Sequence, residues 1–453
     1  MRSSLFVALA LAVALPLTAA AAPTIPWMHD DYPAARAAAR AADKPLVIDL
    51  WAPWCHTCLS MKHTVLQDPA IVAMADRFVW LALDTDRPEN AAALTVLPIA
   101  AWPTFYVTRP ADEAVQARQV GGASVEAFRG FLEAGAAGHR KAATTPFGDQ
   151  ASRGDRAAAG DDRVAAEKAW RAALAAAPAG WIRRPGIVVS ILEVMHGRGA
   201  FADCARFWLD HRAEVTSGAT AAAGDSTYYA TACAEGTGDA ALLETVRRAA
   251  AAPEGPIRQA LAHPDGRLSA DDRSDALRIL REVHDALGDK DAARAAAHEQ
   301  RAVLDGAAAA ARTPLEAMTW HWPRAEVYVY LGVPAELVPA LEASVAALPD
   351  QYDPPYRLAW VQLQVGHLEA ARAAAEKAVG LAYGPRKARV LSLLADIHAK
   401  RGDRPAERAA RQGVVDLLAG LPVGQRSEKS LDAARAALSA LDAPPPPPPP
   451  PSH

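Results

Sequence analysis

The chain has 453 residues, a length that predicts two or three domains. Hydrophobic residues make up 51% of the chain and charged residues 22%, which excludes a wholly disordered protein. The 48 basic and 52 acidic residues give a formal net charge of −4, so composition offers no electrostatic basis for binding nucleic acid or an anionic membrane. The four cysteines are too few for a disulfide-rich scaffold, so each is considered individually.

The N-terminus has the three-part pattern of a secretory signal peptide over residues 1–21. Arg2 provides a basic start, residues 5–17 form an apolar segment, and small residues follow. The apolar segment is short for a membrane span, and an uncleaved N-terminal anchor is the alternative. We therefore expect export to the bacterial periplasm or the extracellular space, where disulfides persist.

Residues 24–140 predict a first domain in which helices and strands alternate. Short apolar runs, and a weaker fourth run, predict strands at 46–51, 78–83, 102–107 and 115–120. Helices are expected over residues 32–43, 59–74, 87–95 and 124–133.

A Cys-x-x-Cys motif follows the first of these strands, where the chain passes from strand to helix. The free N–H groups and the dipole of a helix start favour a negative sulfur, which lowers the pKa of Cys55. Cys58 lies one helical turn later on the same face and can form a disulfide with Cys55. We interpret Cys55 as the attacking thiol and Cys58 as the resolving thiol. A cationic His56 between them would make the pair more oxidising.

Three segments resemble a known family. The run from Val47 to Cys58 resembles the active-site strand and turn of thioredoxin-like proteins. Residues 102–105 resemble the loop in which this family carries a cis proline. Residues 64–71 more narrowly resemble the C-terminal domain of the periplasmic thiol:disulfide interchange reductases.

The resemblance implies a thioredoxin-like fold and roles for further residues. Asp49 would be a buried carboxylate with a raised pKa that accepts the proton of the resolving thiol. Trp54 would pack beside the cysteine pair. A cis Pro103 and the backbone of Trp102 would pair with an extended substrate strand. One departure is Leu59, which stands where many relatives have lysine.

Metal binding is the chemical alternative for this motif. Cys55, His56, Cys58 and His63 would have to bind one ion, but adjacent Cys55 and His56 are poorly placed to converge. The sequence has no second Cys-x-x-Cys to complete a zinc site. We therefore expect no metal, and no organic cofactor either, because the cysteine pair itself carries the electrons.

Residues 155–440 predict helical repeats, after a polar, breaker-rich linker at 141–154. The pattern is a helix, a glycine turn and an alanine-rich helix, which resembles the tetratricopeptide repeat, most clearly at 356–420. Such pairs stack into a superhelix with a concave surface for a protein partner, and a plain helical spacer is the alternative. The turn glycines lie at residues 160, 199, 238, 288, 332, 366 and 402.

Cys204 and Cys233 are expected on helices of neighbouring pairs. Because those helices should touch, a structural disulfide is reasonable in an exported protein, and two separately buried thiols are the alternative. The chain closes with a run of prolines, for which we expect a disordered tail over residues 443–453.

These features predict an α/β thioredoxin-like domain followed by an all-α helical-repeat solenoid. The expected function is an exported thiol–disulfide oxidoreductase of the protein-disulfide reductase type, acting on client-protein cysteines through Cys55 and Cys58. A membrane-bound or soluble redox protein would recharge the pair, and the repeats would recruit a protein partner. The alternative is an exported protein-binding scaffold with an inactive or structural cysteine pair. The direction of electron flow is left open.

Overall fold

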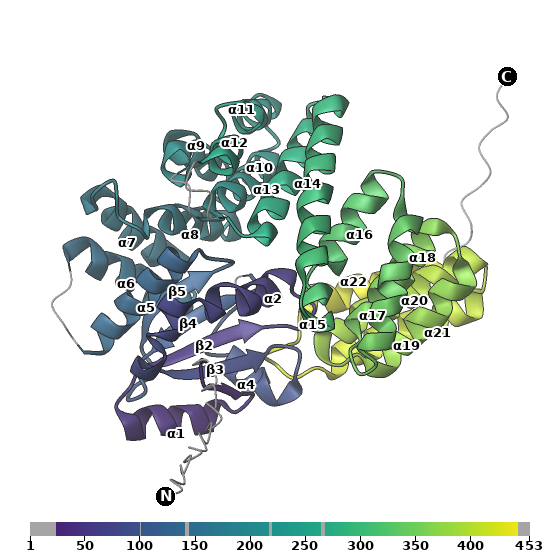
Figure 1. Cartoon of the computed structure of the whole chain (residues 1–453), viewed down its shortest axis with the longest axis horizontal. Helices are drawn as coiled ribbons and strands as arrows, with labels where there is room; N and C mark the ends of the chain where they lie inside the picture. The colour runs from purple at the N-terminus through teal and green to yellow at the C-terminus, as the bar shows by residue number, and fades with distance from the viewer. Residues whose placement is uncertain (1–23, 100, 141–144, 217–219, 264–267, 443–453) are drawn as a thin grey trace, which may run out of the picture.

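The structure is a computed structural model that describes residues 24–99, 101–140, 145–216, 220–263 and 268–442 (Figure 1). The predicted signal peptide, the proline-rich tail and residues 141–144 of the predicted linker lie outside the described residues. None of the helices in the described ranges is long and apolar enough to cross a membrane.

A five-stranded mixed sheet, in the order β1-β3-β2-β4-β5, forms the centre of the first domain. β1 and β2 run parallel to β3, whereas β4 runs antiparallel to both β2 and β5. The central strand β2 is an unbroken apolar run apart from one aspartate, as expected for a strand with both faces covered. The strands are β1 (Trp27–His29), β2 (Leu46–Trp51), β3 (Val79–Asp84), β4 (Thr104–Thr108) and β5 (Val115–Val120).

Helices cover both faces of this sheet, and the sheet separates two hydrophobic cores. One core includes Phe105, Phe128 and Phe131, and the other includes Ala35, Ile48 and Tyr106. The helices of this domain are α1 (Tyr32–Ala42), α2 (His56–His63), α3 (Pro69–Val72), α4 (Ala91–Leu94) and α5 (Val125–His139).

Two elements differ from those predicted. The three-residue strand β1 was missed, because so short a run carries no periodic signal. The helix expected over residues 59–74 is broken after His63 and resumes as α3. The break has a local cause, since Pro69 lacks an N–H and Asp68 caps a new helix by accepting the N–H of Ala70 at 2.8 Å.

Residues 146–154, predicted as part of a linker, instead begin a helix, α6 (Pro146–Ala159). Thr145 caps its start by accepting the N–H of Gly148, and Pro146 takes the first position, where its missing N–H costs nothing. Gly154 does not break the helix. It lies against the indole of Trp170, where a Cβ would come within 2.3 Å of the ring, so this glycine permits a close helix contact.

The second part of the chain is entirely helical over its described residues, and it is built mainly from antiparallel helix pairs. The first half contains α7 (Arg163–Ala176), α8 (Arg184–Gly197), α9 (Phe201–His211), α10 (Ala222–Thr237), α11 (Ala240–Ala251), α12 (Pro256–Ala262), α13 (Ala270–Ala286) and α14 (Lys290–Ala310). The second half contains α15 (Pro314–Met318), α16 (His321–Tyr330), α17 (Val338–Ala347), α18 (Asp353–Val365), α19 (Leu368–Leu381), α20 (Gly384–Arg401), α21 (Arg404–Gly420) and α22 (Glu428–Ser439).

The glycine turns that define the predicted repeats lie between helices, as expected. Six of the seven glycines have a positive φ, a conformation that side chains with a Cβ rarely adopt. At the first turn Gly160 has φ −88°, and the following Asp161 adopts the left-handed conformation instead. The six are Gly199, Gly238, Gly288, Gly332, Gly366 and Gly402.

The helical part curves round one side of the sheet domain (Figure 1). At one end Arg118 of β5 pairs with Glu193 of α8 at 3.1 Å. At the other end the hydroxyl of Tyr383 donates to Asp84 at 2.5 Å. Between these ends α13 and α15 pack against α2, the helix that begins at the Cys-x-x-Cys motif. The repeats therefore enclose the motif.

Candidate redox site

The buried strand β2 and the turn after it fix the position of Cys55. The strand ends at Trp51, and the N–H of Cys55 donates to the carbonyl of Ala52 at 3.1 Å. Cys55 is the N-cap of α2, and its sulfur accepts the N–H of Cys58 at 3.0 Å. A negative sulfur here would accept the same N–H and face the positive end of the helix dipole, which lowers the pKa of a thiol.

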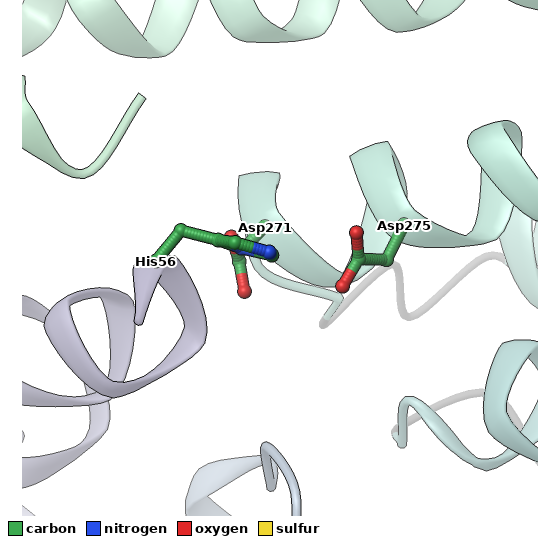
Figure 2. A group of neighbouring side chains, drawn as sticks. All are labelled: His56, Asp271 and Asp275. Carbon is green, nitrogen blue, oxygen red and sulfur yellow. The ribbon is translucent and has the colours of Figure 1, made fainter. Parts of the chain in front are cut away.

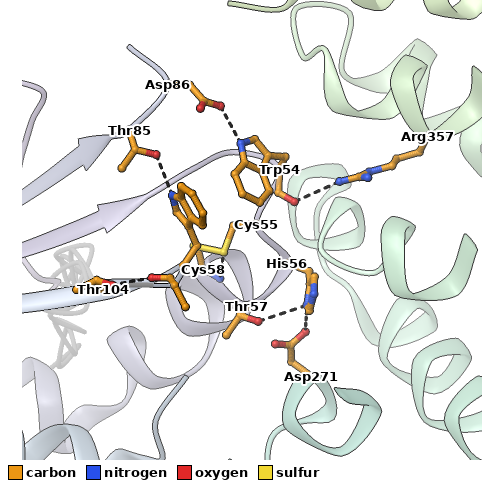
Figure 3. Close-up of a disulfide and its surroundings, with 12 residues drawn as sticks. Trp54, Cys55, His56, Thr57, Cys58, Thr85, Asp86, Thr104, Asp271 and Arg357 are labelled. Carbon is orange, nitrogen blue, oxygen red and sulfur yellow. Dashed lines mark hydrogen bonds and ion pairs between the residues drawn. A yellow bond between two sulfur atoms is a disulfide. The ribbon is translucent and has the colours of Figure 1, made fainter. Parts of the chain in front are cut away.

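Cys55 and Cys58 form a disulfide, with their Cα atoms 5.2 Å apart (Figure 3). Both residues are well covered, because Cys55 is 4% exposed and Cys58 only 1%. The more exposed residue of the two is the one predicted as the attacking thiol. Access for a protein thiol therefore depends on the side chains that surround the pair.

Asp49 lies on β2 and is only 1% exposed, and its Oδ1 has no hydrogen-bond partner within the described part of the chain. Burial raises the pKa of Asp49 to about 6, and the nearby Lys62 ammonium opposes this rise. The Lys62 ammonium lies over the ring of Trp51, and burial lowers its pKa to about 8. The structure thus provides the buried carboxylate that the resemblance implied.

The sequence interpretation missed Lys62. The helical pattern contained a signal for it, because Lys62 follows Cys58 by four residues and so lies on the same face of α2. Leu59 occupies the position at which the resemblance implies lysine. Here Lys62, three residues after Leu59 on the same helix, provides a cation near Asp49.

Two tryptophans stand beside the disulfide. The rings of Trp54 and Trp102 are 5.0 Å apart between centroids, and Trp102 precedes Pro103 through a cis peptide bond. The Trp102 indole N–H donates to Thr85 Oγ1 at 2.9 Å, which fixes the ring. Trp102 is 38% exposed, so it presents an apolar surface to an approaching chain.

The helical part holds Trp54 from two directions, a feature that sequence reasoning did not find. The Trp54 indole N–H donates to Asp86 at 2.7 Å, and the hydroxyl of Tyr352 donates to the same carboxylate at 3.3 Å. Arg357 donates to the carbonyl of Trp54 at 3.3 Å, and the guanidinium of Arg386 lies 4.4 Å from the centre of its ring. Burial and then the neighbouring Asp84 raise the pKa of Asp86 to about 7.

His56 does not stand as a free cation beside Cys55. Its Nδ1 lies 2.7 Å from Oδ1 of Asp271, which belongs to α13 in the helical part. Burial lowers the pKa of His56, but Asp271 and Asp275 outweigh this effect and raise it to about 9. The imidazolium is therefore present at neutral pH, and a carboxylate balances its charge.

Two cavities are lined by residues next to the cysteines, one by Trp54 and the other by Thr57, and Trp102 lines both of them. The larger, of about 710 Å³, lies between the sheet domain and α20–α22 and is lined by Trp54, Arg386 and Ala434 among others. The smaller, of about 200 Å³, is lined by Thr57 of the motif and by Asp225 and Asp272 of the helical part.

Of the residues predicted for the redox site, Cys55 and Cys58 form the disulfide, and Trp54 packs against it. The ring of Trp54 contacts Trp102, which a cis bond joins to Pro103. His56 follows Cys55 and pairs with Asp271, and Asp49 is buried on the strand that leads to the motif. The remaining pair, Cys204 of α9 and Cys233 of α10, forms a second disulfide with a Cα–Cα distance of 6.0 Å. Both residues are fully buried in the helical part.

Comparisons with known proteins agree with this fold for the first domain. No curated protein matches the chain. A crystal structure of a tetratricopeptide repeat protein from Parabacteroides merdae is similar in structure, with 11% identity and a TM-score of 0.41 over 66% of this chain and 99% of that one. Residues 27–104 match the family model described as thioredoxin-like. The part of the chain that carries the Cys-x-x-Cys motif is thus thioredoxin-like.

Proposed function

We propose that this protein is an exported thiol–disulfide oxidoreductase that exchanges electrons with cysteines of client proteins. The observation that carries this proposal is the position of the Cys55–Cys58 pair. Cys55 caps the start of α2, directly after Trp54, whose ring contacts Trp102 of the Pro103 loop. The strand that leads to this turn carries the buried carboxylate of Asp49. A thiolate nucleophile, a resolving thiol and a base are the parts that disulfide exchange needs.

In the reducing direction the Cys55 thiolate attacks one sulfur of a client disulfide. A mixed disulfide forms, and the second client sulfur leaves as a thiolate and takes a proton. Asp49 then accepts the proton of Cys58, whose thiolate attacks the Cys55 sulfur. The first client sulfur leaves as a thiolate, and the Cys55–Cys58 disulfide is formed. Two electrons have passed from the enzyme dithiol to the client.

Client access is through the two cavities on either side of Trp102. The exposed ring of Trp102 and the backbone beside Pro103 suit an extended client segment, which would lie across the disulfide. Helices α20–α22 line the larger cavity, so the repeats help to select the client. A separate redox protein, membrane-bound or soluble, returns electrons to the Cys55–Cys58 pair.

Reduction of insulin by dithiothreitol, followed by turbidity, tests the proposed activity. We expect the wild-type protein to accelerate precipitation and the Cys55→Ser variant to be inactive. The matched control is the double variant Cys204→Ser/Cys233→Ser, which loses the other disulfide and should keep the activity. Equal rates for wild type and Cys55→Ser would refute the proposal. Export is tested separately by locating the protein in fractionated cells.

A protein-binding scaffold with a structural cysteine pair is the second candidate. The low exposure of Cys55 and Cys58 favours it, because a covered disulfide is hard to attack. The two candidates differ in how the pair responds to reductant. An oxidoreductase must cycle between disulfide and dithiol with its fold intact, whereas a purely structural pair would resist reduction until the protein unfolds.

A further inference from the structure

Three side chains from the two parts of the chain converge beside the redox site (Figure 2). They are His56, at the start of α2, and Asp271 and Asp275, on α13. Asp271 and Asp275 are four residues apart and therefore share one face of the helix. One ligand atom from each of the three lies within 4.8 Å of the other two.

Asp271 provides a second, independent observation. It is only 1% exposed, and its Oδ1 is taken by the imidazole of His56. Its Oδ2 is buried and has no hydrogen-bond partner among the residues that the structure describes. A buried carboxylate oxygen without a partner is costly, and a cation bound between these side chains would relieve that cost.

Acidic groups are concentrated around this cluster. Asp225 and Asp272 act electrostatically on the same region, and Glu326 acts on His56, so five carboxyl groups gather here. The guanidinium of Arg278 contacts two carboxylates, that of Asp275 at 3.7 Å and that of Glu282 at 2.9 Å. His56 acts as a cation on Asp275 and Glu326, and Arg281 acts on Glu326 as well.

We propose that His56, Asp271 and Asp275 bind a divalent transition-metal ion of the zinc class. One imidazole and two carboxylates are donors that zinc accepts, with water completing its coordination. Metal–ligand distances near 2 Å place neighbouring donors about 3.3 Å apart, so small side-chain movements would open the present ion pair to admit the metal. The imidazole gives up its proton to solvent when it coordinates.

The site is open to solvent from one side. The side chains of His56 and Asp275 are 22% and 33% exposed, and Asp275 lines the smaller cavity together with Thr57. The bound ion would join the first residue of α2 to α13, and so fasten the helical part to the turn that carries Cys55. This inference does not depend on the proposed redox activity.

The test is calorimetric titration of zinc chloride into untagged, chelator-treated protein with both disulfides intact. A thiol reagent confirms that no cysteine is free to bind zinc. We expect one zinc ion per chain and a rise in Tm on addition of zinc. With cobalt in place of zinc, visible d–d absorption should appear at the same stoichiometry.

Asp275→Asn is the main variant, because Asp275 is partly exposed and its loss should leave the fold intact. We expect it to weaken zinc binding at least tenfold and to abolish the rise in Tm. Asp271→Asn, which removes the buried carboxylate, should have the same effect. The matched control is His298→Gln, which removes an exposed imidazole on α14 and should change the affinity by less than twofold. A wild-type protein that binds no zinc, or an Asp275→Asn variant that binds it equally well, overturns the proposal.

Discussion

The imidazole of His56 and the carboxylate of Asp271 lie 2.7 Å apart although 215 residues separate them in the chain. His56 is the residue directly after Cys55, and Asp271 is buried at the start of α13. The electrostatic environment of the cysteine pair is thus set partly by the helical part. The sequence predicted a cationic imidazole at this position, and the structure gives that cation a partner.

Removal of the Asp271 charge should make the Cys55–Cys58 pair more oxidising. In Asp271→Asn the imidazolium of His56 loses its partner and acts more strongly on the Cys55 thiolate, which stabilises the dithiol. At pH 6 and without metal we expect the reduction potential against glutathione to become less negative by about 30 mV, the equivalent of one pKa unit. His56→Gly should cancel the effect of Asp271→Asn. A potential that is unchanged in Asp271→Asn would show that this pair does not tune the site.

The buried carboxylate of Asp49 should give the resolving step a pH dependence. Asp49 accepts a proton only when ionised, and its pKa is raised to about 6. The rate of mixed-disulfide resolution should therefore rise with pH through about 6 in the wild type. Asp49→Asn should remove this inflection and slow the step at pH 7.5 by about 100-fold, a typical contribution of a general base.

Lys62 provides a control for that assignment. Its ammonium opposes the rise in the Asp49 pKa, so Lys62→Met should move the inflection to higher pH and keep it. Stopped-flow measurements with a preformed mixed disulfide, made from pH 4.5 to 8.5, compare the three proteins. An inflection near pH 6 that persists in Asp49→Asn would assign the titration to another group.

The parts of the site that depend on residues adjacent in the chain could be predicted from the sequence. Strand β2, the cap position of Cys55 and the loop at Pro103 each depend on a few adjacent residues and match a known pattern. The glycine turns of the repeats were predictable for the same reason, because each needs a left-handed residue at one position.

The contacts that enclose the site could not be predicted in this way. Asp86 receives hydrogen bonds from Trp54 and from Tyr352, which lies 266 residues further along the chain. The pairing of His56 with Asp271 is of the same kind. Such contacts depend on how the helix pairs curve, and that curvature accumulates from small rotations at each repeat. A single sequence gives no measure of those rotations.

The disulfide between Cys204 and Cys233 should stabilise the helical part. It closes a loop with a sequence separation of 29 residues, for which the chain-entropy relation gives about 3–4 kcal/mol. The double variant Cys204→Ser/Cys233→Ser should lose a comparable free energy of unfolding, measured with urea under oxidising conditions. Under reducing conditions the difference between the variant and the wild type should largely disappear. A difference that stays the same in reductant would mean that serine packing, and not the crosslink, is responsible.

Gly154 should tolerate no larger residue, although it lies within a helix where alanine is normally preferred. A Cβ at this position would come within 2.3 Å of the Trp170 ring, so Gly154→Ala must push α6 away from α7. We expect a loss of about 1–3 kcal/mol in the free energy of unfolding, the usual cost of overpacking. The matched control is Gly306→Ala on α14, where no atom of the described residues lies within 4 Å of the added Cβ. That variant should gain about 0.5–1 kcal/mol from helix propensity. Equal effects in the two variants, measured by urea unfolding, would rule out a close α6–α7 contact as the reason for glycine at position 154.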